Sequence, residues 1–171
     1  MLLTIRLIFQ SIYHFILLQN KKLVDEKDLG LKNLSNIRLD FFEKTLDKTI
    51  EDDSDRALIK RILELLEDAK AEEVVLVDAK KRSSLADYLL ICEGRSQLHC
   101  RGISESVEHN LKKEGNVSLG IEGECEGNWV LLDFGNIVLH VFHPEIRKYY
   151  RLEELYEHGQ GKNNIKKVCE V

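Results

Sequence analysis

The apolar positions from residue 54 onward switch between helical and strand spacing. The first helical repeat begins at Ser54, a good N-cap, and continues to about Ala69. Its apolar positions are Leu58, Ile59, Ile62, Leu63, Leu65 and Leu66. A second helix is expected after Ser96, also a good N-cap, with an inner face formed by Ile103, Val107 and Leu111.

Continuous apolar runs in the same region predict strands that are covered on both faces. Residues 74–77 form such a run, and residues 86–92 are predicted to form a second strand. A shorter strand is expected at residues 117–121. Apolar strands of this kind need cover on both faces, so the sequence predicts helices packed on a central sheet.

The segment 127–145 has the pattern of a hairpin. Two apolar strands are joined at Gly135-Asn136, a pair that readily supplies the positive φ of a tight turn. A helical turn then opens at Pro144, and a short helix is expected at residues 152–156. The whole order is helix, strand, strand, helix, three strands and a final helix, which predicts a mixed α/β fold.

Composition divides the chain into three parts. Residues 1–53 form an N-terminal extension of unknown role, residues 54–158 form the domain, and residues 159–171 form a Gly-, Lys- and Asn-rich tail expected to be disordered. A short amphipathic helix is plausible at residues 37–50, before an acidic linker at residues 51–53.

Residues 2–18 are largely apolar, and three interpretations stay open. The segment is shorter than the ~20 residues of a spanning helix and lacks the small-residue cleavage site of a secretory signal. It is an organelle-targeting or membrane-proximal helix, a packing helix, or translated sequence upstream of the true start. The oligomeric state, the organism and the compartment are not given by the sequence.

Charge favours a protein partner over nucleic acid. The 171 residues carry a formal charge of −5, and residues 54–158 hold 14 Lys and Arg against 20 Asp and Glu. Non-specific nucleic-acid binding relies on basic side chains, so we expect no direct DNA binding and favour a basic protein partner. The chain has four widely spaced cysteines, which argues against zinc and for reduced thiols in a cytosol-like compartment: Cys92, Cys100, Cys125 and Cys169.

Two features could support anion or metal chemistry. Gly94-Arg95-Ser96 precedes a helix, where free N–H groups could hold an anion. The glycine spacings of the P-loop and of the dinucleotide-binding loop are both absent, so a helix-capping turn is the simpler interpretation. Asp87 and Asp133 could act as acid, base or magnesium ligands. Neither has a second carboxylate two residues later, so we expect no metal site.

Histidine, serine and tryptophan candidates are equally weak as catalysts. His140 and His143 lie three apart in a strand, so their side chains point to opposite faces. The serines Ser83, Ser84 and Ser96 lack a nucleophile-elbow pattern. Trp129, the single Trp, is either a core residue or an interface anchor. We therefore predict no catalytic residue and no cofactor.

Two ordered motifs resemble the ribosomal silencing factor (Iojap) family. The first is residues 86–96, Ala-Asp-Tyr-Leu-Leu-Ile-Cys-Glu-Gly-Arg-Ser, with His99 soon after. The second is Trp129-Val-Leu-Leu-Asp-Phe-Gly, followed by residues 138–145 and by Arg147-Lys-Tyr-Tyr. Glu93 departs from the pattern, because small or hydroxyl residues are common there.

The resemblance implies a mixed five-stranded sheet flanked by helices, on a scaffold similar to a nucleotidyltransferase, and a protein that is not an enzyme. Family members bind the large ribosomal subunit at its protein numbered fourteen, on the face that the small subunit covers. That binding blocks subunit joining and lowers translation under starvation, and some members form homodimers. The implied location is cytoplasmic, or an organelle if residues 1–53 are a targeting segment.

By analogy with the family, the contact face would use residues of the predicted hairpin: Trp129, Leu131, Asp133, Phe134, Val138, His140 and Phe142. Strand alternation implies that all seven cannot share one face. Trp129, Leu131 and Asp133 form one set and Val138, His140 and Phe142 form another, and the sequence leaves open whether the hairpin twist brings both sets to the partner. The alternative is a nucleotide-binding or nucleotidyltransferase-like enzyme, with Gly94-Arg95-Ser96 cradling phosphate and Asp87 as base. Such an enzyme would need a Gly-Ser and an Asp-x-Asp pair, which the residues after Gly94 do not provide.

Overall fold

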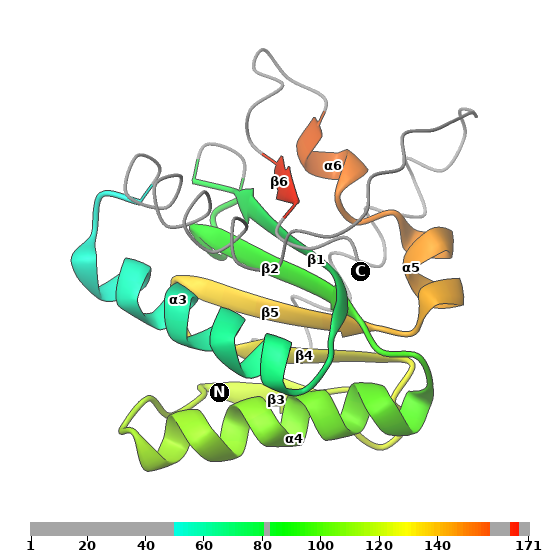
Figure 1. Ribbon diagram of the computed structural model, residues 1–171. Helices are drawn as coiled ribbons and strands as arrows, with labels where there is room; N and C mark the ends of the chain where they lie inside the picture. The colour runs from blue at the N-terminus through cyan, green and yellow to red at the C-terminus, as the bar shows by residue number, and fades with distance from the viewer. Residues whose placement is uncertain (1–49, 81–82, 158–164, 168–171) are drawn as a thin grey trace, which may run out of the picture.

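The computed structural model describes residues 50–80, 83–157 and 165–167. Six strands form one sheet in the order β3-β4-β5-β2-β1-β6 (Figure 1). The strands are β1 (Glu72–Asp78), β2 (Tyr88–Glu93), β3 (Gly120–Glu122), β4 (Trp129–Asp133), β5 (Ile137–Phe142) and β6 (Ile165–Lys167). The helices are α3 (Asp53–Asp68), α4 (Gln97–Lys113), α5 (Pro144–Tyr150) and α6 (Glu154–Glu157). The predicted order of helices and strands is confirmed, and β6 adds a sixth strand.

The sheet is mixed because of one pair of strands. β2 and β5 run parallel, whereas every other pair of neighbours runs antiparallel. Parallel neighbours need a crossover connection, and here α4, β3 and β4 all lie between β2 and β5 in the chain. The strand predicted at residues 86–92 is confirmed as β2, which is buried along almost its whole length.

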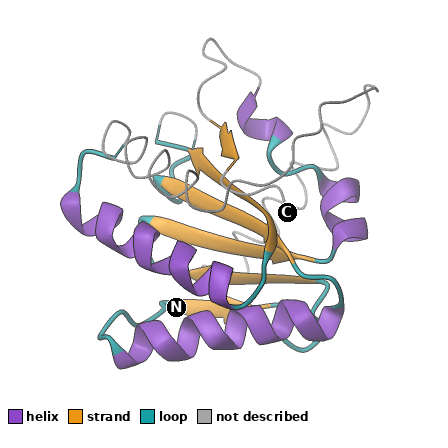
Figure 2. Cartoon of the chain, in the orientation of Figure 1, coloured by secondary structure: helices purple, strands orange, loops and turns teal. Residues whose placement is uncertain are grey.

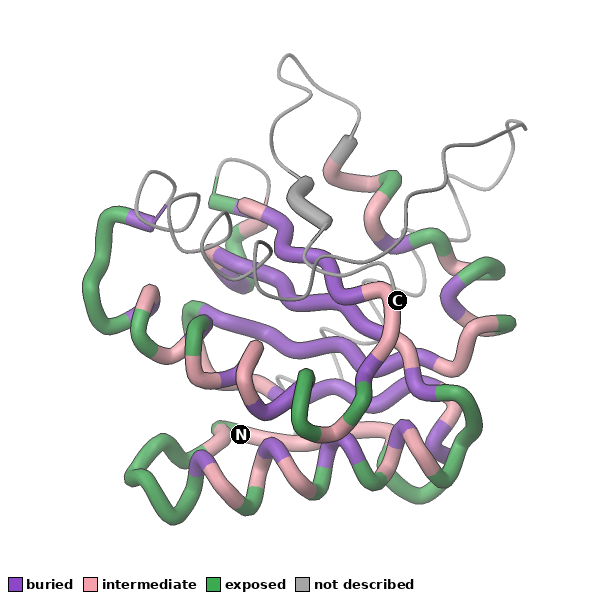
Figure 3. Tube along the Cα trace, viewed as in Figure 1, coloured by how far each residue is buried: buried purple, intermediate pink, exposed green. Residues whose placement is uncertain are grey.

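The two long helices lie together on one face of the sheet (Figure 2). The predicted inner face of α4 is confirmed, since Ile103, Val107 and Leu111 have no exposed surface. They share a core with Ile59 and Leu66 of α3 and with the apolar residues of the strands beneath. Figure 3 shows this alternation of buried and exposed positions along both helices.

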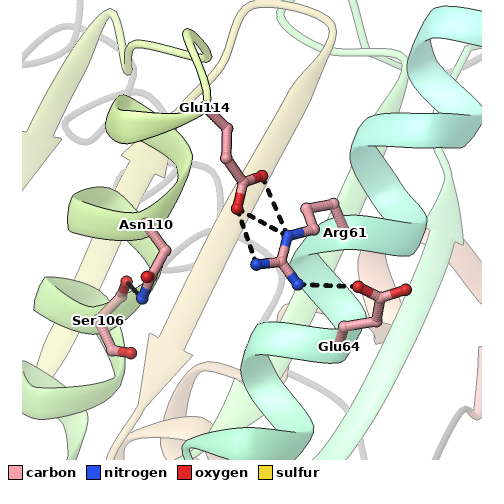
Figure 4. Close-up of polar contacts among 5 residues, drawn as sticks. All are labelled: Arg61, Glu64, Ser106, Asn110 and Glu114. Carbon is pink, nitrogen blue, oxygen red and sulfur yellow. Dashed lines mark hydrogen bonds and ion pairs between the residues drawn. The ribbon is translucent and has the colours of Figure 1, made fainter.

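An ion-pair network joins the outer surfaces of α3 and α4 (Figure 4). The Arg61 guanidinium donates from Nη2 to Glu114 at 2.7 Å and from Nη1 to Glu64 at 2.8 Å. The same guanidinium holds the pKa of the Glu114 carboxyl below its usual value. The network therefore fixes the end of α4 against the middle of α3.

Several boundaries differ from the sequence predictions. The N-cap of α3 is Asp52 rather than Ser54, because the Asp52 carboxylate accepts from the N–H groups of Ser54 and Asp55. The strand expected at 117–121 is only three residues long, and the exposed Val117 precedes it. Residues 152–156 form a helix only from Glu154.

The terminal segments differ from expectation in one place. Residues 165–167, in the tail expected to be disordered, form β6 and pair with β1. The predicted helix at 37–50 falls outside the described residues except for Ile50, and the segment 2–18 falls outside them entirely. Within the described ranges, no helix is both long and apolar enough to cross a membrane.

The loop before β4 generates a test of the fold. Gly123 has a φ of +84°, and a Cβ there would overlap the carbonyl oxygen of Trp129. We expect Gly123→Ala to lower the free energy of unfolding by ~3 kcal/mol. The matched control is Gly102→Ala in α4, where a Cβ meets no atom within 4 Å. This substitution should raise the free energy of unfolding by ~1 kcal/mol, because alanine favours the helix over glycine. Urea denaturation measures both, and wild-type stability of Gly123→Ala would contradict the loop geometry.

Candidate functional site

The β4–β5 hairpin brings both halves of the predicted contact set to one face. Trp129 lies opposite Phe142, Leu131 opposite His140, and Asp133 opposite Val138. Directly paired residues on neighbouring strands point the same way, so these six side chains share a face. The expectation that all seven residues cannot share one face is confirmed, because Phe134 packs on the other side of the sheet. The two sets of three, whose relation the sequence left open, are brought to one face by the antiparallel register.

Phe134 is the exception among the seven predicted residues. It follows β4 and packs against the core beneath α3 and α4, on the opposite side of the sheet. Its backbone N–H donates to the carbonyl of Ile137 at 2.9 Å and closes the hairpin. Phe134 thus supports the turn from the other face.

Aromatic rings gather at the end of this face where β4 begins. The Trp129 ring stacks on Phe142, with centroids 4.6 Å apart and planes inclined by 26°. Tyr150 of α5 lies 5.2 Å from the same indole, and His140 lies 5.7 Å from it. The sequence predicted the hairpin residues of this group but not Tyr150, which reaches them only because α5 folds back beside the sheet.

A buried hydrogen bond ties the two strands together inside the cluster. Trp129 donates from its indole Nε1 to Nδ1 of His140 at 3.1 Å. The His140 side chain is 1% exposed, and burial lowers its pKa to about 3. His140 is therefore neutral near pH 7, with Nδ1 as an acceptor, and it contributes a ring surface rather than a charge.

Three hydrogen bonds anchor the turn of the hairpin. Asp133 accepts from the N–H of Gly135 at 2.7 Å, and Gly135 has a φ of +87°. The backbone carbonyl of Asn136 accepts from the N–H groups of Asp87 and Tyr88, each at 2.9 Å. The half-buried Asp133 carboxylate is thus already engaged in shaping the turn, in addition to any contact it makes with a partner.

Arg147 is a structural residue that sequence reasoning missed. Its side chain, only 10% exposed, pairs with Glu153 at 2.5 Å and with Glu93 at 3.4 Å. It also donates to the carbonyl of Glu73 at 2.7 Å. Glu93, which departs from the family pattern, could have indicated this role. A carboxylate at the end of a buried strand requires a cationic partner, and the sequence offered Arg147 as one. Arg147 fixes α5, and with it Tyr150, at the end of the sheet.

The other candidates for chemistry have structural roles. Ser96 caps α4 by accepting from the N–H of His99 at 3.1 Å. Nδ1 of His99 accepts from the N–H of Arg95 at 3.1 Å, and its Nε2 lies 2.9 Å from the carbonyl of Ala69. The expected helix-capping turn at Gly94-Arg95-Ser96 is confirmed. In the part of the chain that the structure describes, no three His, Cys, Asp or Glu side chains converge as metal ligands would.

The hairpin face is poorly equipped for proton transfer. Its members are apolar or aromatic apart from Asp133 and the neutral His140. Five of the seven predicted residues are at most 7% exposed: Trp129, Leu131, Val138, His140 and Phe142. Their role as a contact surface stays a prediction.

Comparison with known proteins gives a consistent result. Residues 52–170 match the family model described as ribosomal silencing factor during starvation. A ribosomal silencing factor of Halalkalibacterium halodurans is 36% identical over 103 residues, which cover 60% of this chain and 88% of that protein. A mouse protein named for mitochondrial assembly of the ribosomal large subunit is 28% identical and is covered over 44% of its length.

Solved structures show the same fold. A crystal structure of a protein from Chromobacterium violaceum is 33% identical, with a TM-score of 0.58 over 62% of this chain and 88% of that one. A Bacillus halodurans structure is 35% identical, with a TM-score of 0.54 over 59% of this chain and 94% of that one. The family model begins at residue 52, so the similarity that it describes lies in the α/β domain and the residues that follow it.

The buried His140 generates a prediction about acid stability. Its pKa is about 3 in the folded chain against an ordinary 6.5, so the unfolded state binds more protons between these values. The stability that the neutral His140 contributes is complete above pH ~6.5 and is lost at up to ~1.4 kcal/mol per pH unit as the pH falls toward 3. Asn at position 140 can accept the same indole hydrogen bond without titrating. The free energy of unfolding of His140→Asn should therefore fall less steeply with decreasing pH than that of the wild type.

Urea denaturation at several pH values measures these slopes. His109→Asn, at an exposed position of α4, is the matched control and should keep the wild-type pH dependence. Equal slopes for wild type and His140→Asn would show that His140 does not titrate on unfolding.

Proposed function

Because the chain belongs to the ribosomal silencing factor family, we propose that it represses translation by binding the large ribosomal subunit and blocking its association with the small subunit. The observation that carries this proposal is the family match over residues 52–170. The name of the mouse relative points to the large subunit as well. By the family resemblance, the partner is the large-subunit protein numbered fourteen, and a homodimer is compatible with this role.

We propose that the partner contacts the hairpin face formed by Trp129, Leu131, Asp133, Val138, His140 and Phe142. Large aromatic side chains with little conformational freedom are frequent at the centres of protein interfaces. Here the Trp129–His140 hydrogen bond and the stacked Phe142 hold the rings in place before any partner binds. Such preorganisation reduces the entropy lost on binding.

Charge supports a basic protein as the partner. Residues 54–158 carry six more acidic than basic residues, and Asp133 lies on the hairpin face itself. Opposite charge on two partners speeds their association and disfavours incorrect ones. We further propose a regulatory rather than catalytic protein, and a cytoplasmic location like that expected for its bacterial relatives. An organelle is the alternative, since an Arabidopsis relative is named as mitochondrial.

Neutralising Asp133 tests the proposed face. Asp133→Asn keeps an oxygen that can accept from Gly135, so the turn should survive while the charge is removed. We expect binding to isolated large subunits to weaken by roughly threefold to tenfold, or ~1 kcal/mol. Co-sedimentation of the full chain measures this, with Asp68→Asn at the exposed end of α3 as the matched control. Unchanged binding by Asp133→Asn would remove this residue from the interface.

Subunit joining tests the proposed activity. The full chain is incubated with large subunits before small subunits are added, and joined ribosomes are separated from free subunits on a gradient. We expect the yield of joined ribosomes to fall as the protein concentration rises. The order of addition is the control, because a protein that competes for the joining face should act more weakly on ribosomes that have already joined. A constant yield in both orders would refute subunit blocking.

A further inference from the structure

Among the residues that the structure describes, a single Phe, Tyr or Trp side chain is exposed to solvent. Tyr149 of α5 is 59% exposed, whereas the other exposed large apolar side chains are aliphatic. By contrast, Trp129, His140 and Phe142 of the hairpin face are at most 5% exposed. A partner can therefore reach the Tyr149 ring without any rearrangement of the hairpin.

Tyr149 is the outer end of a row of rings that begins in the hairpin. Its ring meets Tyr150 edge-on, with centroids 5.0 Å apart and planes at 87°. Tyr150 lies 5.2 Å from Trp129, which stacks on Phe142. Ring pairs at such separations attract one another beyond the effect of the area that they bury. The exposed Tyr149 ring is thus continuous with the aromatic cluster of the proposed contact face.

Ion pairs hold α5, and with it Tyr149, beside the end of the sheet (Figure 1). Arg147, two residues earlier, pairs with Glu93 at the end of β2 and with Glu153 after α5. It also donates to the carbonyl of Glu73 in β1. Tyrosine has only two side-chain torsions, so a partner that packs on the Tyr149 ring removes little conformational freedom.

The exposed charges around Tyr149 favour a protein over RNA as the partner. Residues 145–154 expose two acidic and two basic side chains: Glu145, Lys148, Arg151 and Glu154. Arg151 also lies 3.4 Å from Glu154. An RNA-binding surface needs an excess of basic side chains to neutralise phosphates, and this surface has none. Mixed charges around an aromatic centre are instead typical of the rim of a protein interface.

We propose that Tyr149 is a contact residue for the large-subunit protein that the hairpin face binds, and that Arg147 is the residue that positions it. This assignment rests on the proposed function and adds α5 to a contact set that the sequence placed in the hairpin alone. Tyr149 supplies an apolar centre at the end of the face where Trp129 pairs with Phe142, whereas Asp133 supplies a charge at the other end. Contacts at both ends fix the orientation of the partner.

Truncation of the ring tests the contact. In the full chain, we expect Tyr149→Ala to bind isolated large subunits roughly tenfold more weakly than wild type, because exposed aromatic anchors contribute strongly to interfaces. Tyr149→Phe keeps the ring and should bind within about twofold of wild type. The matched control is Leu98→Ala, since Leu98 is 71% exposed and α4 packs on the opposite face of the sheet from α5.

Co-sedimentation measures each dissociation constant, and circular dichroism shows that each variant is folded. Equal binding by wild type and Tyr149→Ala overturns the contact while the proposed function stands. A loss as large with Tyr149→Phe or Leu98→Ala also overturns it. If the wild type binds no large subunits, the proposed function fails and the Tyr149 contact fails with it.

Crosslinking tests the chemical class of the partner. A photo-crosslinking phenylalanine analogue at position 149 keeps an aromatic ring there. With large subunits, we expect crosslinks to a ribosomal protein that are identified by mass spectrometry and resist ribonuclease. Crosslinks to ribosomal RNA alone, crosslinks to a second copy of this chain alone, or an absence of crosslinks to the subunit overturn the proposed partner.

A double-variant comparison tests the role of Arg147. Glu153→Gln removes a charge that faces Arg147 but keeps an accepting oxygen and the pair with Glu93, so the fold should be retained. We expect this change to weaken binding about threefold in the wild-type chain and to have no further effect in Tyr149→Ala, because Arg147 acts through the ring. A loss of the same size in both backgrounds overturns the positioning role.

Discussion

The parallel pairing of β2 with β5 is the constraint on which the rest of the structure depends. Tyr88 aligns with Ile137 and Glu93 with Phe142, so the whole of β2 lies along the whole of β5. Between these strands the chain must form α4, cross the sheet and return through β3 and β4. Asn136 sets the register, because its carbonyl accepts from both Asp87 and Tyr88 at the start of β2. A hairpin placed in this way has one face against α3 and α4 and presents the aromatic cluster on the other.

The polar groups within that cluster are arranged so that it carries no charge. Nδ1 of His140 is occupied by the Trp129 indole, and burial disfavours protonation of the ring. The charged groups nearest the α5 end are instead gathered around Arg147, whose partners Glu93 and Glu153 are also mostly buried. The aromatic cluster thus holds no charge that burial would leave unpaired, since the ionic groups near it pair with one another around Arg147.

The sequence predicted well those features that depend on local periodicity. The apolar spacing of Ile103, Val107 and Leu111 is sufficient to define the inner face of α4, and the apolar residues 89–92 are sufficient to indicate β2. Features that depend on distant partners were missed. Arg147 reads as one more surface cation until α5 brings it to Glu93. Likewise, the common direction of Trp129 and Phe142 follows from the strand register, which alternation within one strand does not contain.

The pairing of β6 with β1 has a consequence for how the chain emerges during synthesis. Val77 of β1 lies opposite Ile165, although 88 positions separate them in sequence, and a contact between such distant residues forms late. The other five strands and both long helices precede residue 158, so they are synthesised before β6. Until β6 arrives, β1 is an open edge, and an open edge is the part of a sheet most prone to pair with another chain. Residues 165–167 therefore determine when this nascent chain stops being vulnerable to aggregation.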